Sequence, residues 1–220
     1  MAAKRFICNW RMVIAATLTL LMPGAHAAGD VDWPHYLGDA KSSQYSALDQ
    51  INTGNVARLE RVWTYHSGGE AQIQCNPLIV EGLLFGVSAE RSIFALHAAT
   101  GLEAWRFTPP DPEASRSVSR GVAYWRNGSS PRIIAALGRF LYALDARTGA
   151  ICKEFGEQGA VDIREAFDRD AGELSLGSTT PGIIYRDSII VTTRVSEARP
   201  AAPGDILGFD LRTGQRKWIF

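Results

Sequence analysis

The chain repeats one pattern three times: ALHAATGLEAW at residues 95–105, ALDARTG at 143–149 and GFDLRTGQRKW at 208–218. Each copy has two small or apolar residues, a His or Asp, two spacers and Thr-Gly, and a Trp follows the Gly by four residues in the first and third copies. An apolar run that ends before Thr-Gly predicts a strand, a tight turn whose glycine takes a positive φ, and a second strand. The repeated glycines are 48 and 65 residues apart, which indicates a repeat architecture with one insertion.

Apolar runs around the three copies give each of them the length of a four-stranded unit. We expect strands at residues 61–66, 77–87 (two strands around a turn at 81–82), 92–96, 105–107, 121–124, 132–137, 140–144, 182–185, 189–194 and 206–210, and the second unit to end near residue 155. Radial four-stranded units with a periodic Gly and aromatic signature are typical of propeller blades. The sequence therefore predicts an all-β fold, a β-propeller with tryptophan-docking repeats, of which this chain holds about three blades.

The second copy of the repeat departs from the pattern. Lys153 stands where the repeat would place its Trp, and the polar residues 156–178 form a long insertion that explains the wider second spacing. Loops of that length in compact domains are usually functional or mobile. We expect Trp105 and Trp218 to wedge blade against blade, and the Asp residues of the repeats to brace turns.

The first residues are typical of an export signal. Three basic residues precede the apolar stretch 13–22, and Ala25-His26-Ala27 gives a small-x-small cleavage pattern. The apolar run is short for a membrane span, so we expect residues 1–27 to be a signal peptide cleaved after Ala27. A retained membrane anchor is the alternative. Export of this kind places the mature protein in the periplasm, with no integral membrane segment after cleavage.

The other end of the chain lies two residues after the Trp of the third copy, at Phe220. A propeller needs several blades to close, and terminal repeats are normally atypical. We therefore interpret residues 28–220 as the amino-terminal portion of a longer propeller. Open sheet edges and apolar faces in such a portion would favour association.

Composition excludes some classes of partner and favours an all-β core. The formal net charge is zero with 21% charged residues, so nothing points to nucleic acid or to an anionic membrane surface. A hydrophobic content of 46% with 21 Gly and 10 Pro suits a turn-rich domain. Cys75 and Cys152 could form a disulfide in an oxidising compartment, but cysteines in separate blades are more often buried small hydrophobes. The chain lacks a CxxCH motif for c-type haem attachment.

Further segments, in a fixed order, accompany the repeats. They read WPHY at 33–36, QIN at 50–52, NV at 55–56, QCNP at 74–77, RGVAYW at 120–125, STTP at 178–181 and APGDI at 202–206. Together with the repeats, this ordered set resembles the dehydrogenases that depend on pyrroloquinoline quinone (PQQ), the quinoproteins that oxidise alcohols or sugars in the periplasm. The likeness spans residues 33–220. It is nearer to the glucose and alcohol dehydrogenase-like branch than to methanol dehydrogenase, because Ala114 and Ser115 stand where the latter has adjacent cysteines.

The resemblance implies a propeller of eight blades with PQQ on its central axis, and it assigns roles to two residues first. Arg120 would pair with a PQQ carboxylate or quinone oxygen, since the guanidinium fork matches planar oxygens. Thr179 would donate its hydroxyl to a cofactor carboxylate. The alternatives are that Arg120 only caps a strand start and that Thr179 is an ordinary residue at the start of a strand.

Three further residues receive roles from the same resemblance. Glu197 matches a carboxylate that ligates Ca²⁺ in the family, and a hard cation of this kind prefers oxygen ligands. A solvated loop glutamate is the alternative. Gln74 stands where relatives often carry a Glu near the cofactor, which puts that contact in doubt, and Arg116 would add positive charge over the quinone. The catalytic base and the remaining metal ligands of the family correspond to segments beyond Phe220.

Two main functional hypotheses follow. The first is a PQQ-dependent alcohol or aldose dehydrogenase that passes electrons to the respiratory chain through a quinone or cytochrome c, with this chain itself an incomplete catalyst. The second is a non-catalytic propeller that serves as a protein-binding scaffold in the periplasm; Ala28 after the cleavage site, in place of a lipobox Cys, counts against a lipoprotein of that kind. A glycan-binding propeller has only the aromatic content in its favour.

Overall fold

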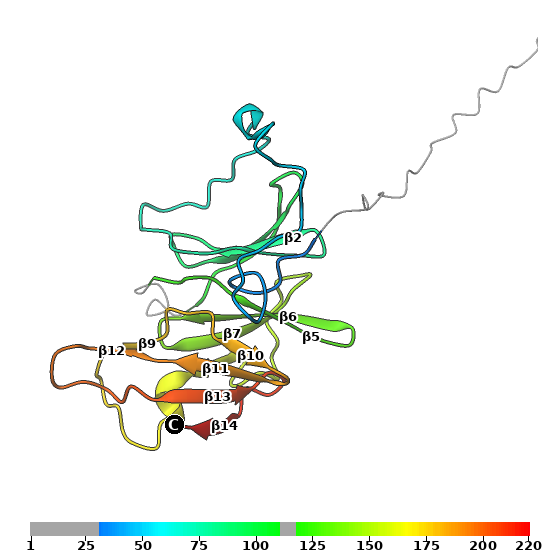
Figure 1. The fold of residues 1–220 in the computed structure, drawn as a ribbon. Coiled ribbons are helices and arrows are strands. Elements are labelled where there is room, and N and C mark those ends of the chain that lie inside the picture. The colour runs from blue at the N-terminus through cyan, green and yellow to red at the C-terminus, as the bar shows by residue number, and fades with distance from the viewer. Residues whose placement is uncertain (1–30, 111–117) are drawn as a thin grey trace, which may run out of the picture. The chain divides into compact units, whose positions relative to one another are not determined.

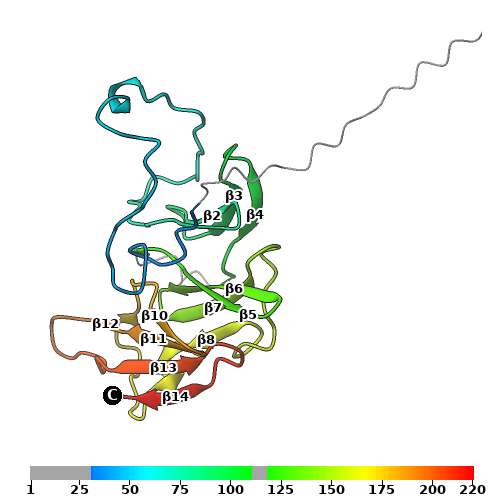
Figure 2. The same ribbon diagram turned by 45° about the vertical axis from the view of Figure 1, so that its right-hand side comes forward.

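Each repeat lies in its own four-stranded antiparallel sheet in the computed structural model, which describes residues 31–110 and 118–220 (Figure 1). The first blade is β1 (Leu78–Val80), β2 (Leu83–Val87), β3 (Ile93–His97) and β4 (Glu103–Phe107); the second is β5 (Ala123–Asn127), β6 (Ser130–Leu137), β7 (Phe140–Asp145) and β8 (Ala160–Asp162); the third is β10 (Ile183–Tyr185), β11 (Ser188–Thr192), β13 (Ile206–Asp210) and β14 (Arg216–Ile219). The strands of each blade are hydrogen-bonded in chain order. Figure 2 labels all four strands of the second blade. The prediction of an all-β propeller is confirmed.

The remaining elements are short. A two-stranded sheet pairs β9 (Leu176–Gly177) with β12 (Arg194–Val195), and two 3-10 turns, η1 (Val56–Arg58) and η3 (Ile163–Ala166), are the helical elements of the described residues. Among those residues, none forms a helix long and apolar enough to cross a membrane. The predicted signal peptide lies outside the described residues, as does Arg116.

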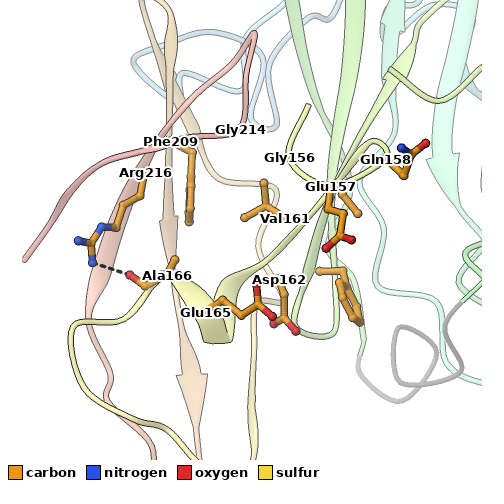
Figure 3. Close-up of a pocket in the computed structure, with 12 residues that line it drawn as sticks. Gly156, Glu157, Gln158, Val161, Asp162, Glu165, Ala166, Phe209, Gly214 and Arg216 are labelled. Carbon is orange, nitrogen blue, oxygen red and sulfur yellow. Dashed lines mark hydrogen bonds between the residues drawn. The ribbon is translucent and has the colours of Figure 1, made fainter. Parts of the chain in front are cut away.

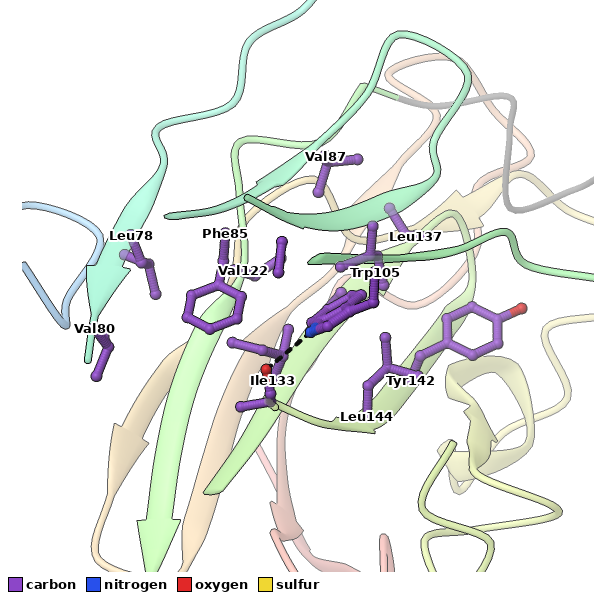
Figure 4. Packing of buried hydrophobic residues seen from close by; sticks show 14 residues of the cluster. Leu78, Val80, Phe85, Val87, Trp105, Val122, Ile133, Leu137, Tyr142 and Leu144 are labelled. Carbon is purple, nitrogen blue, oxygen red and sulfur yellow. Dashed lines mark hydrogen bonds between the residues drawn. The ribbon is translucent and has the colours of Figure 1, made fainter. Parts of the chain in front are cut away.

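The second blade is buried on both faces because side chains of a strand alternate between its two faces. Along β6, Ile133, Ala135 and Leu137 join the core shared with the first blade, whereas Ile134 and Ala136 join the core shared with the third. A strand covered on both faces needs no polar side chain, and this explains the unbroken apolar run that the sequence shows there. Figure 4 shows the first of these two cores.

An indole lying on a glycine joins the first blade to the second. The Trp105 Nε1 donates to the Ala146 carbonyl at 3.0 Å, and a Cβ on Gly149 would lie 2.6 Å from the indole ring. Gly149 has a φ of +71°, which L side chains rarely adopt. The glycine is therefore needed twice, for the turn and for the close approach of the ring.

Trp63 makes the same contact with the first blade. Its Nε1 donates to the Ala98 carbonyl at 3.1 Å, and a Cβ on Gly101 would lie 2.6 Å from its ring. The segment 61–66 thus occupies the position of an outer strand of a neighbouring blade, although the strand predicted there is absent. Tyr65 adds a contact through hydrogen bonds with Glu103 and Arg106 of β4, and burial together with the Glu103 hydrogen bond raises the pKa of Tyr65 to about 12.

A guanidinium replaces the indole between the second and third blades. Lys153 is exposed, and the backbone of Gly156 covers Gly214 instead. Leu211 corresponds in the repeat to Ala98 and Ala146, and its carbonyl accepts a hydrogen bond from the buried Arg132 at 2.9 Å.

Three further contacts hold Arg132 in that position. Its guanidinium also donates to the Arg212 carbonyl at 2.9 Å, and its carbon lies 5.8 Å from the centre of the Trp125 ring. It forms an ion pair with Glu154 as well. Arg132 therefore supplies the donor that Trp supplies elsewhere.

The outer strand of the second blade is interrupted, which the sequence interpretation missed. Ile151 bridges to Leu144, the chain then leaves the sheet, and β8 resumes the pairing with Ala160 opposite Tyr142. The predicted end of the blade near Phe155 is therefore wrong. Phe155 is fully buried in the core shared with the third blade, and part of the supposed insertion is strand.

The turns of the repeats are braced as expected. Asp145 accepts hydrogen bonds from the backbone of Arg147 at 3.0 Å and of Thr148 at 2.9 Å, and Asp210 does the same in the third copy. Burial acts to raise the pKa of Asp210, but the hydrogen bond from Lys217 and those from the backbone outweigh it and lower the pKa to about 2.

Two other expectations have different outcomes. Trp218 lies against Gly208 of its own sheet and is 40% exposed, so it packs against no following blade within the described residues. Cys75 and Cys152 are both free, and they are half-buried rather than fully buried as expected.

The indole contact can be tested by adding a methyl group to its glycine. Gly149→Ala should lower the free energy of unfolding by about 3 kcal/mol, because the left-handed conformation and the clash with Trp105 both oppose the methyl group. Gly82→Ala is the matched control: its φ is +77° and a Cβ there meets nothing within 4 Å, so only the backbone cost of about 1 kcal/mol should remain. If urea denaturation shows the same loss of unfolding free energy in both variants, the docking of Trp105 on Gly149 is contradicted.

The substitute contact is tested by Arg132→Met. The buried Leu211 carbonyl, the partly buried Arg212 carbonyl and Glu154 would lose their donor, and we expect the free energy of unfolding to fall by about 3 kcal/mol. Arg147→Met is the control, because Arg147 is exposed and donates to a single carbonyl, that of Ser129. Its cost should stay below about 0.5 kcal/mol. Urea denaturation followed by tryptophan fluorescence compares the two.

Candidate functional site

The segments that precede the innermost strands of the three blades are hydrogen-bonded to one another. The Asn76 amide donates to the Arg120 carbonyl at 2.9 Å, and the Arg120 amide donates to the Thr179 carbonyl at 2.9 Å. Gly121 allows this approach, because its φ is +138° and a Cβ would lie 2.7 Å from the Asn76 carbonyl oxygen. Residues far apart in sequence are thereby brought together where each blade begins.

The same contact joins the side chains of Arg120 and Thr179. The Arg120 guanidinium donates to the Thr179 hydroxyl oxygen at 3.1 Å; Thr179 is buried and Arg120 is exposed. A hydroxyl that accepts from a guanidinium keeps its own proton to donate. The pair therefore offers charged and neutral donors to the oxygens of an anionic ligand.

Among the described residues, neither Gln74 nor Glu197 is hydrogen-bonded to Arg120 or Thr179. The Gln74 amide donates to the Gln72 side chain at 3.1 Å. Glu197 is exposed and follows β12, whose Arg194 pairs with Gly177 and whose Val195 pairs with Leu176.

An apolar cavity of about 430 Å³ is lined by residues that closely follow Arg120 and Thr179 in the sequence. Its walls include Val122 and Ala123 after Arg120, and Thr180 and Pro181 after Thr179, with residues 34–42 on the other side. Tyr124 also lines the cavity; its hydroxyl is buried without a hydrogen-bond partner among the described residues, and burial raises the pKa of Tyr124. This cavity runs along β5 and β10 and gives the site an apolar wall.

A second cavity lies elsewhere, between β8 and the third blade (Figure 3). Its volume is about 560 Å³, and Glu157, Asp162 and Glu165 give it an acidic lining. None of the predicted site residues with a described position lines it. It adjoins the contact between Gly156 and Gly214, and we attribute it to the interrupted outer strand rather than to the candidate site.

Sequence reasoning missed three arginines that lie beside the candidate site. Arg139, Arg164 and Arg194 line a cavity that shares Thr179 with the pair described above. They come from a turn of the second blade, from η3 and from β12. No local pattern marks them, since only the pairing of β9 with β12 and the packing of the turn bring them together.

The chain matches the model of a known family over residues 33–220: "Glucose/ethanol/alcohol dehydrogenase, beta-propeller domain", a PQQ family. The chain belongs to this family. It is 30% identical to a quinate/shikimate dehydrogenase (quinone) of Acinetobacter baylyi, over 91% of the chain and 29% of that protein. It is 30% identical to a quinohemoprotein alcohol dehydrogenase of Comamonas testosteroni, over 88% of the chain and 26% of that protein.

The solved structure of the Comamonas testosteroni alcohol dehydrogenase also resembles the chain. The TM-score is 0.71 at 27% identity, over 89% of this chain and 28% of the other. The chain therefore spans less than a third of the length of these quinoproteins.

The residues present fit a PQQ carboxylate, but the described residues do not by themselves fit a calcium ion. Arg120 and the proton of Thr179 suit planar, negatively charged oxygens. Calcium takes six to eight oxygen ligands, and the described part of the chain contains no group of three or more His, Cys, Asp or Glu side chains that could hold a metal. Glu197 could at most supply one ligand of such a site.

Proposed function

We propose that this chain is the amino-terminal part of the propeller of a PQQ-dependent dehydrogenase that oxidises an alcohol or an aldose sugar in the periplasm. Residues 1–27 act as the signal peptide in this proposal, and electrons pass to the respiratory chain through a quinone or a cytochrome c. Membership of the PQQ family supports it. The observation that carries it is the hydrogen bond between Arg120 and Thr179 where the innermost strands begin.

The roles proposed for the residues of this chain concern binding rather than proton transfer. When bound, PQQ supplies an ortho-quinone that takes two electrons and two protons from the alcohol, which leaves as an aldehyde, a ketone or a lactone. Arg120 neutralises one carboxylate and fixes its plane, and Thr179 donates its hydroxyl proton to the same group. The apolar cavity along β5 and β10 limits access of water from that side. No residue of the described chain is assigned as the catalytic base.

The relatives leave the substrate class open. One relative is named for quinate and shikimate, one for glucose and one for alcohol. At identities of about 30%, the names alone do not select among a hydroxy acid, a sugar and a simple alcohol.

The proposal is tested on the full-length protein by PQQ titration, followed by quenching of tryptophan fluorescence, and by dye-linked oxidation of alcohols and aldoses. Arg120→Met should weaken PQQ binding about 30-fold, because one charge-assisted pair is lost. Arg126→Met is the control, since Arg126 lies at the other end of β5 and pairs with Glu81. If the wild-type protein neither binds PQQ nor oxidises any compound of the panel, a protein-binding scaffold is the better interpretation.

The calcium role of Glu197 has its own test. If Glu197 supplies a ligand, Glu197→Gln should raise the calcium concentration needed for half-maximal activity about tenfold or more, since one anionic oxygen is lost. Glu157→Gln, an exposed glutamate of the second blade, serves as the control. A calcium titration of Glu197→Gln that coincides with the wild type would remove Glu197 from the metal site.

A further inference from the structure

Arg91 is a buried arginine in the turn between β2 and β3 of the first blade. The residue is only 5% exposed, and a charge so well removed from water is normally paired with an opposite charge. Burial lowers the pKa of its guanidinium, and no carboxylate of residues 31–110 or 118–220 counteracts this effect. The described part of the chain therefore leaves Arg91 without a counter-ion.

The Arg91 guanidinium uses only part of its capacity to donate hydrogen bonds. Its Nη1 donates to the Ser88 carbonyl at 3.4 Å and to the Gln72 carbonyl at 3.5 Å, and both contacts are long. The Nε is buried and meets no acceptor among the described residues, and the Nη2 makes no hydrogen bond with them either. Nε and Nη2 form one edge of the planar group, so their N–H bonds offer a fork that matches two oxygens of one planar oxyanion.

Arg132 shows how this fold satisfies a buried guanidinium with groups of its own. Arg132 is 8% exposed, donates to the Leu211 and Arg212 carbonyls at 2.9 Å each, and pairs with Glu154. Arg91 is buried to a similar extent, but its two contacts with carbonyls are longer and it has no carboxylate partner in the ranges that the structure describes. This difference indicates that the partner of Arg91 is a group from outside the described residues.

The turn that carries Arg91 is held by its own hydrogen bonds and is separate from the candidate site. The Ser88 amide donates to the Ser92 carbonyl at 2.8 Å, and the Ser92 amide donates to the Ser88 hydroxyl oxygen at 3.0 Å. Both serines are buried, so the turn does not need a ligand to order it. No hydrogen bond in the described ranges joins Arg91 to Arg120 or Thr179.

The segment that contacts the guanidinium could move aside for a small solute. Residues 68–73 are exposed and belong to no helix or strand, and they touch Arg91 through the Gln72 carbonyl. A hydrogen bond of 3.5 Å is weak, so a shift of this segment costs little. Arg91 lines none of the three cavities described above, which favours a ligand of only a few atoms.

We propose that the free edge of Arg91 binds a small planar oxyanion from solution, of the chemical class of formate, acetate and bicarbonate. Two oxygens of the anion accept from Nε and Nη2, which is the bidentate arrangement that guanidinium groups favour. The anion supplies the charge and the acceptors that the described chain lacks, and it thereby stabilises the first blade. This site does not depend on PQQ or on the proposed dehydrogenase function.

The test measures urea unfolding of the full-length protein without PQQ, while sodium formate replaces sodium chloride at constant ionic strength. Formate at ten times its dissociation constant should raise the folding equilibrium constant about tenfold, because it binds only the folded state. Hydrogen exchange of the peptide 83–97 should slow over the same range of formate concentration, which locates the effect in the first blade. Arg91→Met should abolish both effects. In chloride alone this variant should be at least as stable as the wild type, because it removes a buried charge that has no partner.

Two further variants separate the fork from the charge. Arg91→Lys keeps the charge but lacks the fork, and it should bind formate about tenfold more weakly. Arg61→Met is the matched control, because Arg61 is exposed and makes no hydrogen bond or ion pair in the described part of the chain; it should respond to formate as the wild type does.

Two results would overturn the inference. One is an equal gain from formate in the wild type and in Arg91→Met, which would indicate a general effect of the solvent. The other is a folding equilibrium constant about 100-fold lower for Arg91→Met in chloride, with no effect of formate on the wild type. That result would show that a carboxylate of the full-length chain already pairs with Arg91. Because the assay contains no PQQ, neither result bears on the dehydrogenase function.

Discussion

The contact between an indole and a glycine is the constraint on which the arrangement of the blades depends. A flat ring can approach the backbone closely only where no Cβ stands, and the turn of each repeat already requires a glycine at positive φ. The carbonyl exposed three residues before that glycine then accepts from the indole N–H. At Trp105 and at Trp63, a single turn provides both the glycine and the carbonyl acceptor. The N–H···O distances and the distances from a Cβ on the glycine to the ring agree between the two contacts to within 0.1 Å. The Thr-Gly turn is therefore an interface element as much as a local one.

The sequence predicted the parts of the fold that are local. Strands on both sides of the first and third Thr-Gly turns, and the braces supplied by Asp145 and Asp210, depend on residues a few positions apart and could be read directly. The third interface could not. Arg132 lies 79 residues from Leu211, and nothing near Lys153 indicates that a guanidinium from another strand replaces the missing indole.

The same distinction between local and long-range contacts applies to the residues of the candidate site. Arg120 and Thr179 were assigned through family resemblance, and the structure joins them although 59 residues separate them. Glu197 was assigned in the same way, but its position depends on the register between β9 and β12, which the sequence does not reveal. The arginines beside Thr179 could not be predicted from the sequence, because they lie in separate segments that only the fold brings together.

One insertion accounts for both the missing indole and the basic cavity. After Cys152 the chain leaves the outer strand of the second blade, returns as β8, and continues through η3 to the loop that precedes Thr179. The detour removes the position at which a Trp could reach Gly214, so the interface between the second and third blades needs Arg132. The same detour carries Arg164 and residues 174–177 to the side of Thr179, where they form a wall of the cavity. The insertion after Cys152 thus removes an indole contact between the second and third blades and supplies a basic cavity that a regular blade would lack. Arg132 replaces the lost contact and so allows the insertion.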